Sequence, residues 1–294
     1  MPAKIFKKIF PGWNRGTYID RKSVNNPPLL LDLYPGASAA YSTRKLDQNY
    51  TGFAVQVRRL SDNATQNIGF VNNEFDSAAY SAFVAGTTGA VSIWYDQSGN
   101  GNNLTNSTAL EQPKFTVVNG KYALSFIASS GQRLVSALGT NAIGTNGLYT
   151  AFGVGLLYDT VGTKILFHQD QGSIRIGQWF RVSGSSNQSI VFSNNNTTNT
   201  TESSFSSSAF SLNMLSLIRR ASSAQLWVNG FTNGATTTPG TPSYSAGNMG
   251  GLYVGRRTLG EAYNGLTPEI ILYPSDMTTD RLAIETNIRN YYGF

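Results

Sequence analysis

Oxygen-bearing side chains alternate along the segment Asp96-Gln97-Ser98-Gly99-Asn100-Gly101. This spacing, with a glycine at the sharp turn, is typical of the first half of a calcium-binding loop. The twelfth position of such a loop is here Ser107 and not a bidentate glutamate. We therefore expect Asp96, Ser98 and Asn100 to bond their own backbone in Asx-type turns. A calcium site, with ligands supplied from elsewhere, is the alternative, and no other cofactor is predicted.

The histidine and arginine residues do not indicate a metal centre or a phosphate-binding cluster. The single histidine, His168, follows an apolar run and has neither a cysteine nor a second histidine to share a metal or a triad. The arginines come in adjacent pairs, such as Arg58-Arg59 and Arg256-Arg257. In a strand, neighbouring side chains point to opposite faces, so each pair offers one guanidinium to a surface. We expect neither a metal centre nor a phosphate cluster.

Aromatic residues in polar surroundings are candidates for stacking against a sugar, because aromatic rings beside amide and hydroxyl groups are typical of glycan sites. The candidates are Trp179, Tyr244 and Tyr263. Trp179 lies in an apolar run, so a position in the hydrophobic core is the alternative for it.

Composition limits the class of protein. The 294 residues include 31 serines, 28 threonines and 27 asparagines, while charged residues make up 13% and cysteine is absent. Coiled coils, helical repeats, disulfide frameworks and cysteine-ligated metals are thereby excluded. No apolar run reaches the length of about 18 to 20 residues that spans a bilayer.

The net charge of +6 is concentrated at the N-terminus, where residues 1–22 hold +5 of it. The rest is nearly neutral, so we expect no nucleic-acid partner. The basic start has no continuous apolar segment of a signal peptide. We predict that residues 1–27 form an arm that docks onto a protein partner, with a membrane surface or a solvated tail as alternatives. Its expected contacts are large apolar groups and lysines, namely Phe6, Phe10, Trp13, Lys4, Lys7 and Lys8.

Short alternating apolar runs predict strands throughout residues 28–294, which we expect to form one domain. They include Leu29 to Leu33, Ala40 to Leu46 and Phe53 to Leu60. In the last run Phe53, Val55 and Val57 should face one way, and Gln56 and Arg58 the other. Asn119-Gly120 and Asn229-Gly230 predict hairpin turns, because both residues tolerate positive φ. The stretch Ser193 to Ser208 predicts a loop or an exposed sheet edge.

Only two segments have helical spacing. One follows Asn73 and Asp76 and ends at Gly86, and the other carries an apolar stripe from Met277 to Tyr291 and stops at Gly293. Many strands with two peripheral helices predict an all-β protein, an antiparallel two-sheet sandwich with one short internal helix and a C-terminal helix.

Three stretches carry a resemblance to a known family. They are Ala40 to Leu46 with Val57 to Asn63, the motif Trp94 to Thr105, and the ending Ile271 to Asp276 with the terminal helix. They resemble the concanavalin A-like (laminin G-like) jelly-roll sandwich domains of phage and bacterial surface proteins. They are also similar to the catalytic sandwich of family 54 α-L-arabinofuranosidases.

The resemblance to the arabinofuranosidases implies two catalytic carboxyl groups at given places. A retaining glycosidase needs a nucleophile and an acid about 5 Å apart. The matching stretches, Gly255 to Thr258 for the acid and Ser173 to Gly184 for the nucleophile, contain no Asp or Glu. Carboxylates elsewhere that could replace them, none paired by its spacing, are Asp159, Asp170, Glu202, Glu261 and Glu269.

We therefore expect a non-enzymatic protein without glycosidase activity. The leading hypothesis is a structural or adhesion protein on the surface of a phage virion, anchored to assembly proteins by its arm, homo-oligomeric, and presenting a head that could bind a host glycan. The alternatives are an arabinofuranosidase-type glycoside hydrolase with relocated carboxylates and a secreted carbohydrate-binding module.

Overall fold

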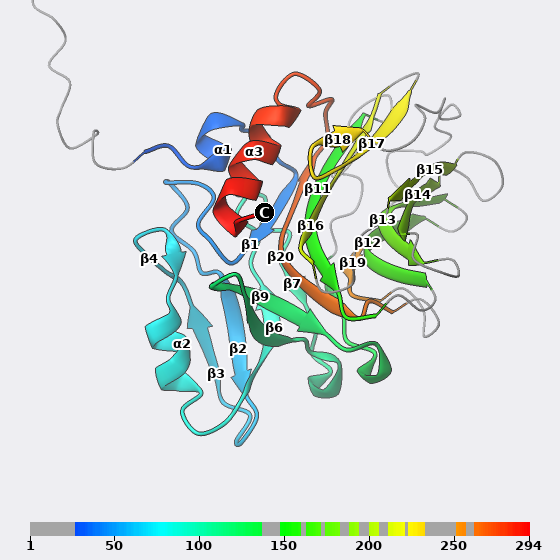
Figure 1. The fold of residues 1–294 in the computed structure, drawn as a ribbon. Helices are drawn as coiled ribbons and strands as arrows, with labels where there is room; N and C mark the ends of the chain where they lie inside the picture. Colours follow the sequence, from blue (N-terminus) through cyan, green and yellow to red (C-terminus); the bar gives the residue numbers. More distant parts are fainter. Residues whose placement is uncertain are drawn as a thin grey trace, which may run out of the picture.

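A computed structural model describes residues 27–136, 148–159, 163–171, 174–182, 188–193, 200–205, 211–220, 223–232, 251–256 and 262–294. All of its strand pairs are antiparallel, and one continuous ladder curls so that two layers face each other (Figure 1). The predicted all-β sandwich is confirmed. Residues 1–26, which are all of the predicted arm except Pro27, lie outside the described residues. No helix among the described residues is long and apolar enough to cross a membrane.

The first layer has β20 (Gly265–Tyr273) near its centre, paired with β1 (Ala39–Ser42) and β11 (Tyr149–Leu157). It continues through β16 (Asn213–Arg219), β17 (Ala224–Val228) and β18 (Phe231–Thr232). Every residue of β20, β11 and β16 is buried. Strands buried on both faces read as continuous apolar runs, which explains the weak alternation of these segments.

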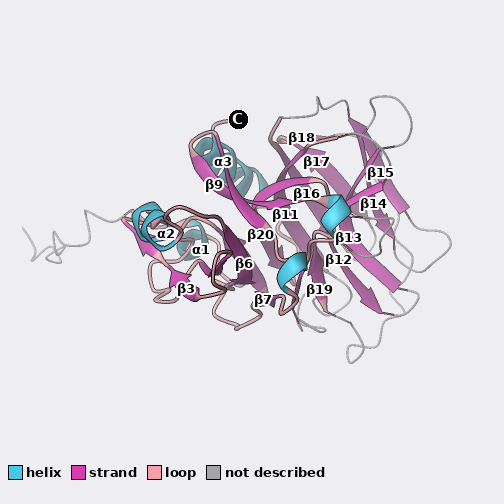
Figure 2. Cartoon of the chain, turned by 90° about the horizontal axis from the view of Figure 1, so that it is seen from below, coloured by secondary structure: helices cyan, strands magenta, loops and turns pink. Residues whose placement is uncertain are grey.

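The second layer runs from β3 (Thr65–Ile68) through β2 (Val55–Arg59), β6 (Gly89–Trp94), β7 (Leu104–Thr105), β10 (Leu134–Ser136) and β19 (Leu252–Val254). It continues through β12 (Thr163–Gln171), β13 (Ile174–Val182), β14 (Gln188–Ser193) and β15 (Thr200–Phe205). Figure 2 shows β13 to β15 at the end remote from α2 (Ser77–Phe83). Among the described strands β15 pairs only with β14, so this part of the predicted Ser193 to Ser208 stretch is a sheet edge.

One hydrophobic core fills the space between the layers, and a second covers the outside of the first layer. Trp94, Val55 and Leu272 belong to the inner core. On the outside, α1 (Leu30–Leu33) and α3 (Arg281–Tyr292) lie side by side against β1 and β20 (Figure 1). The outer face of the first layer is therefore filled, and polar chemistry is left to the outer face of the second layer.

The hairpin β8 (Lys114–Val118) to β9 (Lys121–Phe126) joins the layers, since β8 pairs with β6 and β9 pairs with β20. Asn119 and Gly120 have φ of 48° and 73°, as a type I′ turn requires, which confirms the predicted turn. Asn229-Gly230 forms the corresponding turn between β17 and β18.

The short elements complete the fold. They are the hairpin β4 (Phe70–Val71) with β5 (Glu74–Phe75) and the 3-10 turns η2 (Ala109–Glu111) and η3 (Ala128–Ser130). The predicted internal helix is α2, whose first turn is capped by the Asp76 side chain accepting from the Ala79 N–H at 2.9 Å. The predicted C-terminal helix is α3, which ends at Gly293 with φ of 74°.

Two local predictions are wrong. The run Leu29 to Leu33 is the helix α1 and not a strand, because Asp32 accepts from the Leu29 N–H at 2.7 Å and closes a helical turn. Phe53 is 43% exposed, since β2 begins only at Val55. The alternation within β2 is confirmed, with Val55 and Val57 fully buried and Gln56 on the other face.

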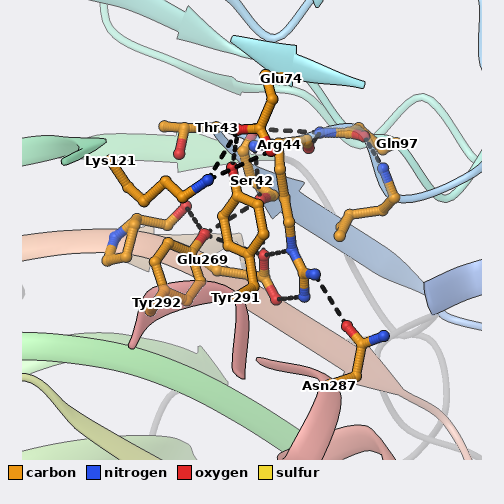
Figure 3. Close-up of polar contacts among 12 residues, drawn as sticks. Ser42, Thr43, Arg44, Glu74, Gln97, Lys121, Glu269, Asn287, Tyr291 and Tyr292 are labelled. Carbon is orange, nitrogen blue, oxygen red and sulfur yellow. Dashed lines mark hydrogen bonds and ion pairs between the residues drawn. The ribbon is translucent and has the colours of Figure 1, made fainter. Parts of the chain in front are cut away.

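A buried ion pair fixes the centre of the first layer. Glu269 on β20 is 1% exposed and receives both a 2.8 Å bond from Arg44 Nε and a 2.9 Å bond from Nη2. Ser42 Oγ and the Tyr292 hydroxyl also donate to it, at 2.7 and 3.1 Å (Figure 3). Burial lowers the pKa of Arg44, but the charge of Glu269 outweighs burial and the pKa is raised. Arg44 therefore keeps its positive charge although it is buried.

We predict that Arg44→Met destabilises the protein by at least about 3 kcal/mol, because it leaves the Glu269 charge buried without a partner. The matched control is Lys121→Met, which removes an exposed 3.2 Å pair with Glu74 and should cost less than about 1 kcal/mol. Urea unfolding of both variants measures the difference. Equal losses of unfolding free energy would contradict the role of the buried pair.

Candidate functional site

A row of directly paired residues crosses the face of the second layer that points away from the core. Side chains of directly paired residues project from the same face of a sheet. The row, one residue per strand from β3 to β13, is Asn67, Gln56, Ile93, Thr105, Val135, Tyr253, His168 and Gly177. We call it the outer row. The outer row runs from a groove on β2 to β10 to the strand β13.

The groove lies on the first half of the outer row and has a volume of about 480 Å³. Ten of its twelve lining residues carry an amide, hydroxyl or guanidinium group, and the other two are Ile93 and Val135. Side-chain hydrogen bonds hold the lining in place. Arg58 Nε donates to Gln112 Oε1 at 2.7 Å, and Gln112 Nε2 donates to the carbonyl of Asn106 at 2.7 Å. The polar groups are thus positioned before any ligand arrives.

A carboxylate stands beside the groove at the ends of β10 and β19. Glu111 on η2 accepts from Arg133 Nε at 3.2 Å and from Arg256 Nη2 at 3.1 Å. Arg133 also lines the groove. Partial burial raises the pKa of Glu111, but the charge of Arg133, a hydrogen bond from Asn106 and the charge of Arg256 outweigh it. The pKa is lowered, so Glu111 carries its negative charge at neutral pH.

The outer row continues from the groove to a stacked pair of rings. His168 on β12 is 1% exposed, and its ring lies parallel to that of Tyr253 on β19, with centroids 4.9 Å apart. The next position across the sheet is Gly177 on β13, which adds no side chain. Within the described residues no group of three or more acidic or histidine side chains gathers that could hold a metal ion.

The structure brings together the two stretches that the resemblance assigned to catalysis. β13 lies within Ser173 to Gly184, and it is separated from β19 by the single strand β12. Gly255 and Arg256 follow β19 directly, while Arg257 and Thr258 lie outside the described residues. Where the resemblance places an acid, Arg256 instead binds the carboxylate of Glu111.

Glu111 was not among the carboxylates singled out from the sequence. Its arginine partners are 22 and 145 residues away along the chain. No short-range spacing could therefore indicate the cluster. In the sequence Glu111 is an isolated acidic residue after a polar loop.

The carboxylates that were singled out do not form a pair in the described structure. Glu269 is used by the ion pair with Arg44, and Asp159 pairs with Lys164 at 3.0 Å. Asp170 on β12 and Glu202 on β15 are three strand spacings apart and also offset along the strands, so they are separated by more than about 14 Å, which exceeds the separation in glycosidase sites. The side chains of Asp170 and Glu202, and all of Glu261, lie outside the described residues.

The aromatic sugar candidates are not gathered at the groove. Tyr263 is fully buried, and its hydroxyl donates to the carbonyls of Leu156 and Leu266, so its ring is not available as a platform. The side chain of Trp179 and all of Tyr244 lie outside the described residues. The same holds for the proposed anchoring residues Phe6, Phe10, Trp13, Lys4, Lys7 and Lys8.

The Asp96 loop contains the expected Asx-type turns. Asp96 Oδ1 accepts from the backbone N–H groups of Ser98 and Ala40, both at 2.9 Å. Its Oδ2 accepts from Ser98 Oγ at 2.8 Å and from the Asn102 N–H at 3.0 Å. The amide of Asn100 donates to the carbonyl of Ala37 at 3.0 Å. Both carboxylate oxygens are thus occupied by bonds that tie this loop to the start of β1.

Comparison with known proteins shows similarity to arabinofuranosidases. A family model described as "Alpha-L-arabinofuranosidase B, catalytic" matches residues 32–237. A probable alpha-L-arabinofuranosidase B of Aspergillus terreus is 47% identical over 73 residues, and an alpha-L-arabinofuranosidase of Hypocrea jecorina is 47% identical over 72 residues. Each match covers 24% of this chain but only 14% of the relative.

Two solved structures share the fold. One is a GH54 arabinofuranosidase soaked with a cyclic sulfate inhibitor, with a TM-score of 0.65 and 18% identity. The other is an arabinofuranosidase complexed with arabinofuranosyl-alpha-1,2-xylobiose, with a TM-score of 0.62 and 20% identity. Both alignments cover 86% of this chain and 62% of the other.

We predict that saturating calcium leaves the melting temperature unchanged, because a cation at Asp96 would have to displace four protein hydrogen bonds. Asp96→Ala should lower the free energy of unfolding by at least about 2 kcal/mol, since it leaves several buried donors without an acceptor. Thermal unfolding with and without calcium, and urea unfolding of the variant, measure both. A calcium-dependent rise in melting temperature that Asp96→Ala abolishes would show a metal site instead.

Proposed function

This chain belongs to the family of α-L-arabinofuranosidase B catalytic domains, and from that membership we propose that it is a glycoside hydrolase that cleaves α-L-arabinofuranosyl bonds. The observation that carries the proposal is the position of the groove. All of its lining residues lie between positions 56 and 135, inside the matched stretch 32–237. We propose the groove on the outer row as the sugar site.

The expectation of a non-enzymatic phage protein is corrected by the same finding. The family model and the matching relatives are arabinofuranosidases, and the relatives named above are fungal. A virion location, virion assembly partners and the absence of an enzymatic role are therefore wrong. The similarity to family 54 arabinofuranosidases is confirmed, whereas the assignment to phage surface domains is not supported.

The chemistry of the groove suits a small neutral sugar. A furanoside offers hydroxyl groups that both donate and accept hydrogen bonds, and a few well-placed polar groups fix its orientation. Gln56 and Asn106 supply amides, and Arg58 and Arg133 supply guanidinium groups, which only donate hydrogen bonds. Ile93 and Val135 can contact the apolar side of the ring.

Glu111 supplies the ionised carboxylate that the reaction needs. Glycoside hydrolysis passes through an oxocarbenium-like transition state, which a nearby negative charge stabilises or attacks as a nucleophile. Arg133 and Arg256 keep Glu111 deprotonated, which fits this role and not that of the general acid. We propose Glu261 as the second carboxyl group, because the next residue, Ala262, pairs with Arg256. Asp170 lies at the other end of β19 and Glu202 lies four strand spacings from β19, so neither can be about 5 Å from Glu111.

We predict that the full chain hydrolyses 4-nitrophenyl α-L-arabinofuranoside and that Glu111→Gln lowers kcat at least about a hundredfold. Glu74→Gln is the matched control. Glu74 is half exposed and pairs with Lys121, away from the groove lining, so kcat should stay within about twofold. Release of nitrophenolate measures both variants.

Glu261→Gln tests for the second group, with Asp170→Asn and Glu202→Gln as controls. Glu261→Gln should lose activity as Glu111→Gln does, whereas the two controls should keep it. Full activity of Glu111→Gln would remove Glu111 from the site. No turnover by the unmodified chain on this substrate would contradict the proposed activity itself.

A further inference from the structure

Four aromatic residues form a surface beyond the β3 end of the outer row. We call Tyr50, Phe53, Phe70 and Tyr95 the aromatic surface. The rings of Phe53 and Tyr95 are tilted with centroids 6.0 Å apart, and those of Tyr50 and Phe70 meet edge to face at 6.3 Å. Phe53 is 43% exposed, and the other three are partly exposed. The ring contacts hold these side chains in place, and their apolar faces remain accessible to solvent.

Hydrogen bonds connect the aromatic surface to the groove. Asn67, the first residue of the outer row, accepts from the Tyr95 hydroxyl at 2.9 Å and from Gln56 Nε2 at 3.2 Å. Gln56 lines the groove. At the other side, the Tyr50 hydroxyl donates to the carbonyl of Phe53 at 2.9 Å. Hydrogen bonds thus lead from the groove through Asn67 to Tyr95, and the ring contact between Tyr95 and Phe53 continues the path to Tyr50.

A second cavity of about 440 Å³ lies on the far part of the aromatic surface. Tyr50 and Phe70 line it together with Lys45, Asn72 and Asn73. The two asparagines have φ of 52° and 67° and form the turn between β4 and β5, which presents their amides beside the rings. Aromatic rings with amide groups and little charge are the surroundings that a neutral saccharide requires.

We propose that the aromatic surface binds further sugar units of a polysaccharide whose arabinofuranosyl unit occupies the groove. The identity of that sugar rests on the proposed function, whereas the surface itself rests on the contacts above. The continuity with the groove favours one extended saccharide over a separate ligand. Each ring that stacks on a sugar contributes affinity for the polymer and none for a small aryl glycoside, which fits within the groove.

The test compares the polymer with the small substrate. Phe53→Ala removes an exposed ring whose side chain makes no hydrogen bond, so the fold should be preserved. The affinity for soluble arabinose-branched xylan, measured by retardation in a native gel, should fall roughly three- to tenfold. KM for 4-nitrophenyl α-L-arabinofuranoside should not change. Phe53→Tyr, which keeps the ring, should bind the xylan like the unmodified chain.

The matched control is Leu282→Ala, which removes an exposed apolar side chain in the first turn of α3. It should leave retardation unchanged, because Leu282 belongs neither to the aromatic surface nor to the lining of the second cavity. Equal retardation of Phe53→Ala and the unmodified chain would overturn the proposal, even if arabinofuranoside hydrolysis is observed. Retardation that Phe53→Ala abolishes, in a chain without hydrolysis, would support the surface while the proposed activity fails.

Discussion

The negative charge of Glu269 is the constraint on which the rest of the fold depends. It lies in β20, a strand buried along its whole length and hydrogen-bonded to β1, β11 and β9. A buried charge is tolerated only with a partner in good geometry, and Arg44 supplies two bonds to it. Arg44 follows β1 and also donates to Asn287 of α3. The pair therefore holds β1 beside β20 and positions the C-terminal helix. Figure 3 shows this convergence.

The location of the groove follows from which faces are already filled. The inner faces of both layers make the core, and α1 and α3 cover the outside of the first layer. The outer face of the second layer carries polar side chains from β2 to β10, and the two arginines that hold Glu111 stand at its edge. A sugar site there needs no opening of the core. The proposed catalytic and polymer-binding roles can share one face because the outer row links the groove and the aromatic surface.

Local chemistry could be predicted from the sequence, and long-range pairing could not. The Asn-Gly turns and the terminal helix depend on neighbouring residues and were predicted correctly. The apolar run Leu29 to Leu33 is compatible with a buried strand and with a helix. The hydrogen bond from the Leu29 N–H to Asp32 favours the helix. Glu111 was missed because Arg256 is 145 residues away. The prediction of a non-enzymatic protein rested on the absence of carboxylates from the two matching stretches. Folding can bring a carboxylate to the site from a distant part of the chain, and the residue types within those stretches do not show this.

The most direct test of the account is where an arabinofuranoside binds. A crystal of Glu111→Gln soaked with 4-nitrophenyl α-L-arabinofuranoside should show the sugar in the groove, within hydrogen-bonding distance of Arg133 and of the amide at position 111, with the nitrophenyl group on the side toward Gln56. Sugar density on the β12 to β15 strands with an empty groove would contradict the account, because the site would then be on the same sheet but built by other residues.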